Sequence, residues 1–244
     1  MIAIFISISQ SLVDSGFSQA LIQKKDACER DFNTVFYFNI IVATIVYGVL
    51  YLIAKPIAVF YGEPLLELLV KMVSLNIVFS SFSVVHLAKL SRDLNFKLQT
   101  KISLISIIVS GACAIYFAHQ GFGVWALVAQ GLFKNGINSL LLFVFSNWKP
   151  KLMFSLKSLR SLFAFGSKLL LSGLLNAVYN NIYYLVIGRL YTASDLGFYT
   201  KANQLQLLPS ETITVIIQRV SFPVLSSIQE DKTSLEIYYK RFVR

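Results

Sequence analysis

The sequence predicts an all-α membrane protein with about seven transmembrane helices, and three observations lead to this fold class. First, 56% of the 244 residues are hydrophobic and 14% are charged, whereas a soluble domain carries roughly 25% charged residues. Second, the chain contains seven long apolar runs. Third, basic residues alternate in step with these runs. The same composition excludes a disordered, collagen-like or disulfide-rich chain.

Each apolar run is long enough to cross a bilayer, because the hydrocarbon core is about 30 Å thick and a helix rises about 1.5 Å per residue. Lipid offers the backbone no hydrogen-bond partners, and a helix satisfies its own N–H and C=O groups. Strands of a membrane barrel would be about ten residues of alternating character. In chain order, the predicted spans are residues 2–22, 32–54, 65–87, 102–118, 123–146, 162–187 and 196–225.

The first four predicted spans contain few charged residues. The first contains Asp14, and the second and fourth contain none. The third contains Glu67 and Lys71, which are four residues apart. Side chains at this spacing meet on a helix surface, so we expect an ion pair.

The last three predicted spans differ in how polar they are. The fifth and the sixth each contain one charged residue, Lys134 and Lys168 respectively. The seventh is the least apolar, and Pro209 predicts a kink within it. Its charged residues are Lys201, Glu211 and Arg219.

The loops between the spans give the orientation. Two basic residues, Lys55 and Arg189, fall in loops on one side, and fifteen fall on the other side. Cytoplasmic loops carry such an excess of Lys and Arg, so Met1 is expected outside and Arg244 in the cytoplasm. The fifteen residues are Lys24, Lys25, Arg30, Lys89, Arg92, Lys97, Lys101, Lys149, Lys151, Lys157, Arg160, Lys232, Lys240, Arg241 and Arg244.

The domain organisation follows from one break in this pattern. Residues 147–161 combine basic residues with Leu, Met and Phe, which predicts an interfacial amphipathic helix that links two halves of a bundle. A start outside the membrane without a signal peptide suggests that a preceding helix is missing, so we expect the chain to be a fragment.

Familiar catalytic and metal-binding patterns are absent from the sequence. Cys28 and Cys113 fit no metal or disulfide framework, and His86 and His119 are expected to be interfacial or helix-capping residues. The sequence GFGVWA at 121–126 resembles a dinucleotide fingerprint but follows an apolar span rather than a strand, so a turn is expected. The prediction is therefore a non-enzymatic protein without cofactor or metal.

Polar residues inside the spans are the candidate site. A charge at the bilayer centre costs about 2.5–3.5 kcal/mol, so such residues usually face a bundle interior or a hydrated cavity. Lys134 and Lys168 have no carboxylate on their own helices, and Asn176 and Tyr179 lie close to the face that carries Lys168. Glu211 and Arg219 are eight residues apart and share a face.

Two interpretations of these residues remain open. The two lysines could line a cationic cavity that holds a phosphate, a pyrophosphate or an acidic sugar, or they could snorkel or pair with acids on other helices. The amides and phenols could line a sugar-accommodating cavity, or they could form hydrogen bonds between helices. The basic loops favour contact with anionic lipid headgroups over nucleic acid, because they alternate with the spans.

Five stretches of the sequence resemble a known family. They are DSGFSQALIQ at 14–23, GFGVWALV at 121–128, IGRLYTASDLGFYTKA at 187–202, QLQLLP at 204–209 and QRVSFPVLS at 218–226. Together they resemble the polysaccharide transporter family of bacterial lipid-linked oligosaccharide flippases. This family is part of the multidrug/oligosaccharidyl-lipid/polysaccharide exporter superfamily.

The resemblance implies a two-lobed fold of twelve to fourteen spans, of which this chain is similar to the second through the eighth. Residues 1–146 would be first-lobe helices, 147–161 a basic cytoplasmic linker, 162–225 the start of the second lobe, and 226–244 a cytoplasmic tail. It also implies flipping of undecaprenyl-diphosphate-linked oligosaccharide across the bacterial inner membrane. The implied partners are this substrate, membrane lipids, and a polysaccharide polymerase and glycosyltransferases, but no nucleic acid.

Two other functions compete with this one. A drug or cation antiporter of the same superfamily should favour acids in its cavity, whereas the central charges here are mainly Lys. A membrane-embedded polysaccharide-assembly enzyme should show a large external loop or clustered His, Asp and Arg, and the predicted outside loops are short. The sequence has no phosphate-binding loop of the GxxxxGK[ST] type, so an ion gradient or substrate flux would supply the energy.

Overall fold

The computed structural model describes residues 9–11, 13, 16–192, 194–206 and 223. Regular structure in this part of the chain is helical, without strands. The helices are α2 (Phe17–Gln23), α3 (Glu29–Tyr61), α4 (Leu65–Arg92), α5 (Phe96–His119), α6 (Val124–Phe145) and α7 (Leu156–Leu190). Residues 194–206 form a further helical segment after α7.

The predicted helical membrane fold is confirmed in this part of the chain. Five helices are long and apolar enough to cross a membrane: α3, α4, α5, α6, and Gly166–Leu190 of α7. About half of the first predicted span and most of the last one lie outside the described residues. The exact count of seven therefore stays a prediction.

The second span is longer than predicted and continues through Pro56. The prediction ended this uncharged run at residue 54 and placed Lys55 and Pro56 in the following loop. In the structure, Ile57 and Tyr61 are buried against the start of α4, and this packing carries the helix on to Tyr61. Gly62 then ends it with a left-handed backbone angle, φ 70°.

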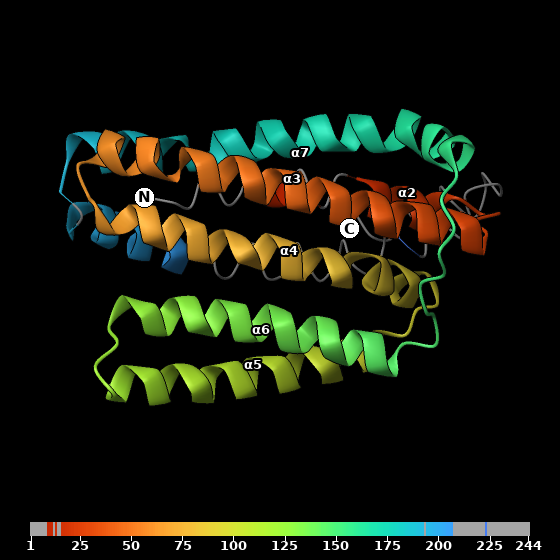
Figure 1. The fold of residues 1–244 in the computed structure, drawn as a ribbon, viewed down its shortest axis with the longest axis horizontal. Helices are drawn as coiled ribbons and strands as arrows, with labels where there is room; N and C mark the ends of the chain where they lie inside the picture. Colours follow the sequence, from red (N-terminus) through yellow and green to blue (C-terminus); the bar gives the residue numbers. More distant parts are fainter. Residues whose placement is uncertain (1–8, 12, 14–15, 193, 207–222, 224–244) are drawn as a thin grey trace.

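The long helices lie side by side, and in the view of Figure 1 their order is α7, α3, α4, α6 and α5. Helix α4 is central, because it packs against α2, α3, α5 and α6. The expected pair within α4 is present, with Lys71 Nζ 2.6 Å from Glu67 Oε1. Outward faces are apolar: in α5, Ile108 and Ile115 are 67% and 73% exposed. Lipid can solvate such surfaces without cost, whereas water cannot.

The three basic connections that the structure describes, between α2 and α3, α4 and α5, and α6 and α7, lie at one end of the bundle, as their alternation with the spans predicts. There the Arg92 guanidinium, at the end of α4, donates hydrogen bonds to the carbonyl oxygens of Leu21, Lys24 and Lys25. These carbonyls belong to the end of α2, where a helix leaves its last C=O groups without internal partners. Arg92 therefore fixes the short helix α2 to α4.

The connector between α6 and α7, residues 146–155, differs from the prediction of an amphipathic helix over 147–161. It is irregular, and only its continuation from Leu156 is helical. Pro150 has no N–H to donate, and side chains of α3 occupy two other backbone donors. The N–H of Lys151 donates to Asn33 Oδ1 at 2.6 Å, and the N–H of Ser155 donates to Thr34 Oγ1 at 3.1 Å.

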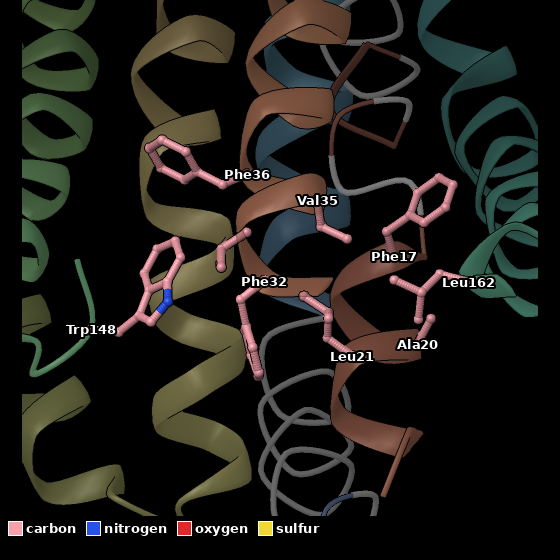
Figure 2. Close-up of a cluster of buried hydrophobic side chains, with 9 residues drawn as sticks. Phe17, Ala20, Leu21, Phe32, Val35, Phe36, Trp148 and Leu162 are labelled. Atoms are coloured by element: carbon pink, nitrogen blue, oxygen red, sulfur yellow. The ribbon is translucent and has the colours of Figure 1, made fainter. Parts of the chain in front are cut away.

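A buried cluster joins this connector to the helices around it (Figure 2). Trp148 of the connector packs against Phe36 of α3, with ring centroids 5.7 Å apart. On the far side of α3, Phe17 of α2 and Leu162 of α7 close the cluster. The connector, α2, α3, α4 and the first turns of α7 therefore share one core at the basic end.

The position of His86 in the sequence suggested a helix end or a membrane interface, and the structure places it elsewhere. It is fully buried in α4, and its ring lies 5.0 Å from that of Trp148 and 5.7 Å from that of Phe143. Within the described part of the chain, its ring nitrogens have no hydrogen-bond partner. His86 thus serves as an aromatic packing residue. His119 is exposed as the last residue of α5, as expected.

We expect Thr34→Val to loosen the connector. The change keeps the side-chain shape but removes the oxygen that accepts from Ser155, at a cost of about 1 kcal/mol. Thr44→Val is the matched control, because the Thr44 hydroxyl also donates to a carbonyl of its own helix but is exposed. In detergent, Thr34→Val should lower the Tm and speed cleavage by trypsin after Lys151. An equal change in Thr44→Val would contradict the anchoring role.

We also expect the exposed thiol of Cys28 to face the cytoplasm. A membrane-impermeant maleimide should label Cys28 in inside-out vesicles and leave it unlabelled in intact cells. In a Cys28→Ser background, Arg189→Cys places a thiol at the opposite end and should show the reverse pattern. Labelling of Cys28 in intact cells would show that the orientation is the opposite of the predicted one.

Candidate functional site

Helix α7 packs on one side and is exposed on the other, where a few polar side chains, here called its polar face, lie among apolar ones such as Leu171 and Leu175. Leu162, Gly166 and Ala177 are buried on the side that packs against α2 and α3. Lys168, Asn176 and Tyr179 are exposed, and Tyr179 shows 75% of its surface. The spacing of these three residues places them together on the opposite side of the helix. The sequence prediction that they share a face is therefore consistent with the exposure pattern of α7.

Amides extend this polar face along α7. The Asn180 amide donates to Asn176 Oδ1 at 3.0 Å, so one amide orients the other. Tyr184, one turn further on, faces elsewhere: its hydroxyl accepts from Asn203 at 2.8 Å, and its ring contacts Tyr199 of the segment 194–206. Of the tyrosines near the end of α7, Tyr179 is on the polar face and Tyr184 is a packing residue.

Lys134 lies on α6, next to residues that bind α6 to α4. The Asn135 amide donates to Asn76 Oδ1 at 2.9 Å, and the Ser139 hydroxyl donates to the Phe79 carbonyl at 2.5 Å. Gly131 leaves room for Asn76, because a Cβ there would lie 3.2 Å from the Asn76 amide. Lys134 itself is exposed.

The structure does not bring Lys134 and Lys168 together. In Figure 1, α6 and α7 lie on opposite sides of α3 and α4. Within the described part of the chain, neither amine has an ion-pair or hydrogen-bond partner. The other two predicted site residues, Glu211 and Arg219, lie outside the described residues.

A cavity that the sequence did not predict lies where α2, α4 and α7 meet. Its volume is about 350 Å³. Ser18 and Gln19 supply polar groups from α2, and Leu169, directly after Lys168, and Gly173 come from α7. These α2 residues belong to the stretch at 14–23 that resembles the polysaccharide transporter family, and no local pattern in that stretch predicts a cavity. The remaining lining residues are Ser11, Gly16, Val84 and Leu87.

Two glycines allow α2 and α7 to approach each other beside this cavity. Gly16 has a positive backbone angle, φ 64°, and a Cβ there would lie 2.6 Å from the Gly166 carbonyl oxygen. A Cβ on Gly166 would lie 3.2 Å from the Phe17 ring. The close contact between α2 and α7 therefore requires glycine at residue 16 and restricts what residue 166 can be.

These groups suit recognition of an anion or a sugar. Lys168 is a cation with three donors, and the amides and hydroxyls nearby can donate to phosphate oxygens and exchange hydrogen bonds with sugar hydroxyls. Among the described residues, no cluster of three His, Cys, Asp or Glu side chains could hold a metal ion.

The stretch at 187–202 has a local structural role that the geometry makes clear. The Thr192 N–H and hydroxyl donate to Asp195 Oδ2 at 3.1 and 2.6 Å, and the Asp195 N–H donates to Thr192 Oγ1 at 3.2 Å. This reciprocal pair is a capping box at the start of the helical segment 194–206. The Thr192 hydrogen bonds hold the pKa of the Asp195 carboxyl below its ordinary value.

A family of polysaccharide biosynthesis proteins matches the whole chain, residues 1–244. The chain belongs to this family. It is 30% identical to the teichuronic acid biosynthesis protein TuaB of Bacillus subtilis, over 89% of this chain and 46% of the relative. It is 27% identical to the succinoglycan biosynthesis transport protein ExoT of Rhizobium meliloti, over 95% of this chain and 47% of the relative.

A third relative is the lipopolysaccharide biosynthesis protein WzxC of Escherichia coli, with 25% identity over 97% of this chain and 49% of the relative. The chain thus spans about half the length of the curated relatives it matches. No solved structure matches it significantly. Family membership and the five spanning helices identify a multi-pass protein of the bacterial inner membrane.

Gly16→Ala should disrupt the contact between α2 and α7. The new Cβ would collide with the Gly166 carbonyl, and a left-handed conformation costs a non-glycine residue roughly 1–2 kcal/mol. Gly173→Ala is the control, because its Cβ would lie 3.9 Å from the nearest atom, in ordinary contact with Ser11. We expect a lower Tm in detergent for Gly16→Ala and an unchanged or higher Tm for Gly173→Ala. Equal Tm values for the two variants would argue against a tight contact.

Proposed function

We propose that the protein takes part in moving lipid-linked oligosaccharide from the inner to the outer leaflet of the bacterial inner membrane. The substrate would be a repeat unit on undecaprenyl diphosphate, destined for lipopolysaccharide, capsule or exopolysaccharide. Family membership supports this proposal, as do relatives named for succinoglycan transport and for lipopolysaccharide biosynthesis. Glycosyltransferases would act before the transport step, and a polysaccharide polymerase would act after it.

The physical task is to carry a diphosphate and several sugars across hydrocarbon. Moving unpaired charges out of water is very costly. A hydrated cavity with cationic and hydrogen-bonding walls removes most of that cost, while the polyprenyl tail remains in lipid. In this proposal, residues 1–146 belong to one lobe and 162–225 begin a second lobe, and rocking of the lobes exposes the cavity to each side in turn.

The observation that carries the proposal is the polar face of α7. Lys168, Asn176 and Tyr179 lie on a spanning helix. All three are exposed in this chain, which spans about half the length of its relatives. Asn176 and Tyr179 lie near the middle of the spanning stretch Gly166–Leu190, and Lys168 lies near its start. Polar side chains within a span usually face a bundle interior or a water-filled cavity. We therefore infer that this face lines a hydrated passage instead of facing lipid. Lys134 would contribute a second cation from α6.

The charges in the spans favour an anionic substrate over a cationic drug. Lys134 and Lys168 have no ion-pair partner among the described residues, whereas the carboxylate of Glu67 in α4 is paired with Lys71 at 2.6 Å. A cation antiporter needs a carboxylate that is free to bind its substrate.

Replacing Lys168 or Lys134 with Ala should impair polysaccharide export. A hydrogen bond to a charged group is worth about 1.5–3 kcal/mol, so we expect roughly a tenfold or larger decrease. Lys168→Arg keeps the charge and should retain most activity. The measurement is surface polysaccharide in cells with equal amounts of the protein in the membrane, together with the lipid-linked repeat units that accumulate inside.

The control for this test is the double variant Glu67→Ala and Lys71→Ala. It removes a lysine from a spanning helix without changing the net charge, and export should stay near normal. Normal surface polysaccharide in both Lys134→Ala and Lys168→Ala would reject the two lysines as substrate-binding residues.

A further inference from the structure

A second cavity lies on the first turns of α7, at the basic end of the bundle. Its volume is about 400 Å³, and it is lined by Leu156, Lys157, Arg160 and Ser161. Lys157, Arg160 and Ser161 are three and four residues apart, so they project from one face of the helix. Two cations and a hydroxyl thus line one side of an open hollow that is large enough for a phosphate group.

Both cations of this cavity lack a partner within the described part of the chain. Their basic neighbours in the connector are engaged: Lys149 donates to the Phe143 carbonyl and lies over the Phe143 ring, and Lys151 is 2.6 Å from Glu29. The sequence from 147 to 192 contains no Asp or Glu. The positive charge at Lys157 and Arg160 is therefore not neutralised by this segment.

The acids in the first turn of α3 do not neutralise it either. Glu29 is paired with Lys151, and Asp31 is paired with Lys24 at 2.8 Å. The N-terminus of α7 is also capped from within, because the Ser158 N–H donates to Ser155 Oγ at 3.3 Å. The cationic side chains, more than free backbone donors, give this cavity its affinity for an anion.

Apolar side chains next to the cavity are exposed. Leu152 is 93% exposed, Leu156 is 73% exposed, and Phe154 is also exposed. Large apolar side chains between basic ones are typical of segments that insert into the boundary between headgroups and acyl chains. A partner that is purely aqueous would leave these side chains in water.

The position of the cavity along α7 agrees with a location near the lipid headgroups. Helix α7 has 35 residues, about 52 Å at 1.5 Å per residue, whereas the hydrocarbon core is about 30 Å thick. The stretch that can span the core is Gly166–Leu190. Arg160 precedes Gly166 by six residues, or about 9 Å, so it lies outside the hydrocarbon core, on the side of the headgroups.

We propose that Lys157, Arg160 and Ser161 bind the phosphate of an anionic phospholipid in the cytoplasmic leaflet, with Leu152 and Leu156 against its acyl chains. Charge complementarity, headgroup depth and the exposed apolar side chains together define this lipid. The site is separate from the polar face of α7 around Lys168, and the proposal does not depend on transport of oligosaccharide. A bound lipid would hold the junction of connector and α7 at the membrane surface.

The test measures how much phosphatidylglycerol stays on the purified protein. The purified protein is titrated in detergent with phosphatidylglycerol, and bound lipid is counted by native mass spectrometry. In the double variant Lys157→Gln and Arg160→Gln, affinity for the tightest lipid should fall by roughly tenfold or more. In Lys149→Gln and Lys151→Gln, which removes the same charge from engaged side chains, it should be unchanged.

Further variants and probes make the result decisive. The charge-preserving double variant Lys157→Arg and Arg160→Lys should bind as the native protein does. Phosphatidylcholine, which has the phosphate but no net charge, should bind much more weakly. Equal losses in both glutamine variants, or equal binding of the two lipids, would overturn the proposal. Displacement of the lipid by a polyprenyl diphosphate at lower concentration would also overturn it, because the site would then belong to the transported substrate.

Discussion

Two buried side chains in the first turns of α3, Asn33 and Thr34, determine how the last long helix joins the others. Each bonds twice: Asn33 donates to Glu29 O and accepts from the Lys151 N–H, and Thr34 donates to Arg30 O and accepts from the Ser155 N–H. Buried polar groups cost stability unless they are paired. The connector is therefore held at one place, which fixes where α7 begins and leaves its polar face turned away from α2 and α3.

The same requirement separates two kinds of polar residue in the spans. Serines of α4 such as Ser81 and Ser83 are buried and donate to carbonyls of their own helix, so they need nothing from outside. Lys71 is balanced by Glu67. The groups left over are on exposed faces: Lys134 on α6 and the face around Lys168 on α7. Because lipid solvates charge poorly, these residues indicate where water or a polar ligand must reach the bundle.

Sequence alone predicted the helices well, because the period and length of an apolar run are imposed by the bilayer and by the backbone's need for hydrogen bonds. It missed what depends on contacts between distant segments. The helix passes Pro56 because Ile57 and Tyr61 pack on α4, and residues 146–155 stay irregular because α3 takes their donors. His86 is buried by Trp148, which is 62 positions away in the sequence. No local pattern contains these partners.

The candidate site shows the same limit. Spacing along one helix placed Lys168, Asn176 and Tyr179 together, but it said nothing about their distance from Lys134 or about the cavity beside Ser18 and Gln19. The residues that carried the family resemblance also have mixed roles. Thr192 and Asp195 cap a helix, and Gly16 permits a close helix contact, so these motif residues are accounted for by folding. A motif can therefore identify the family while the residues that meet the substrate lie elsewhere, on the faces that folding leaves unpaired.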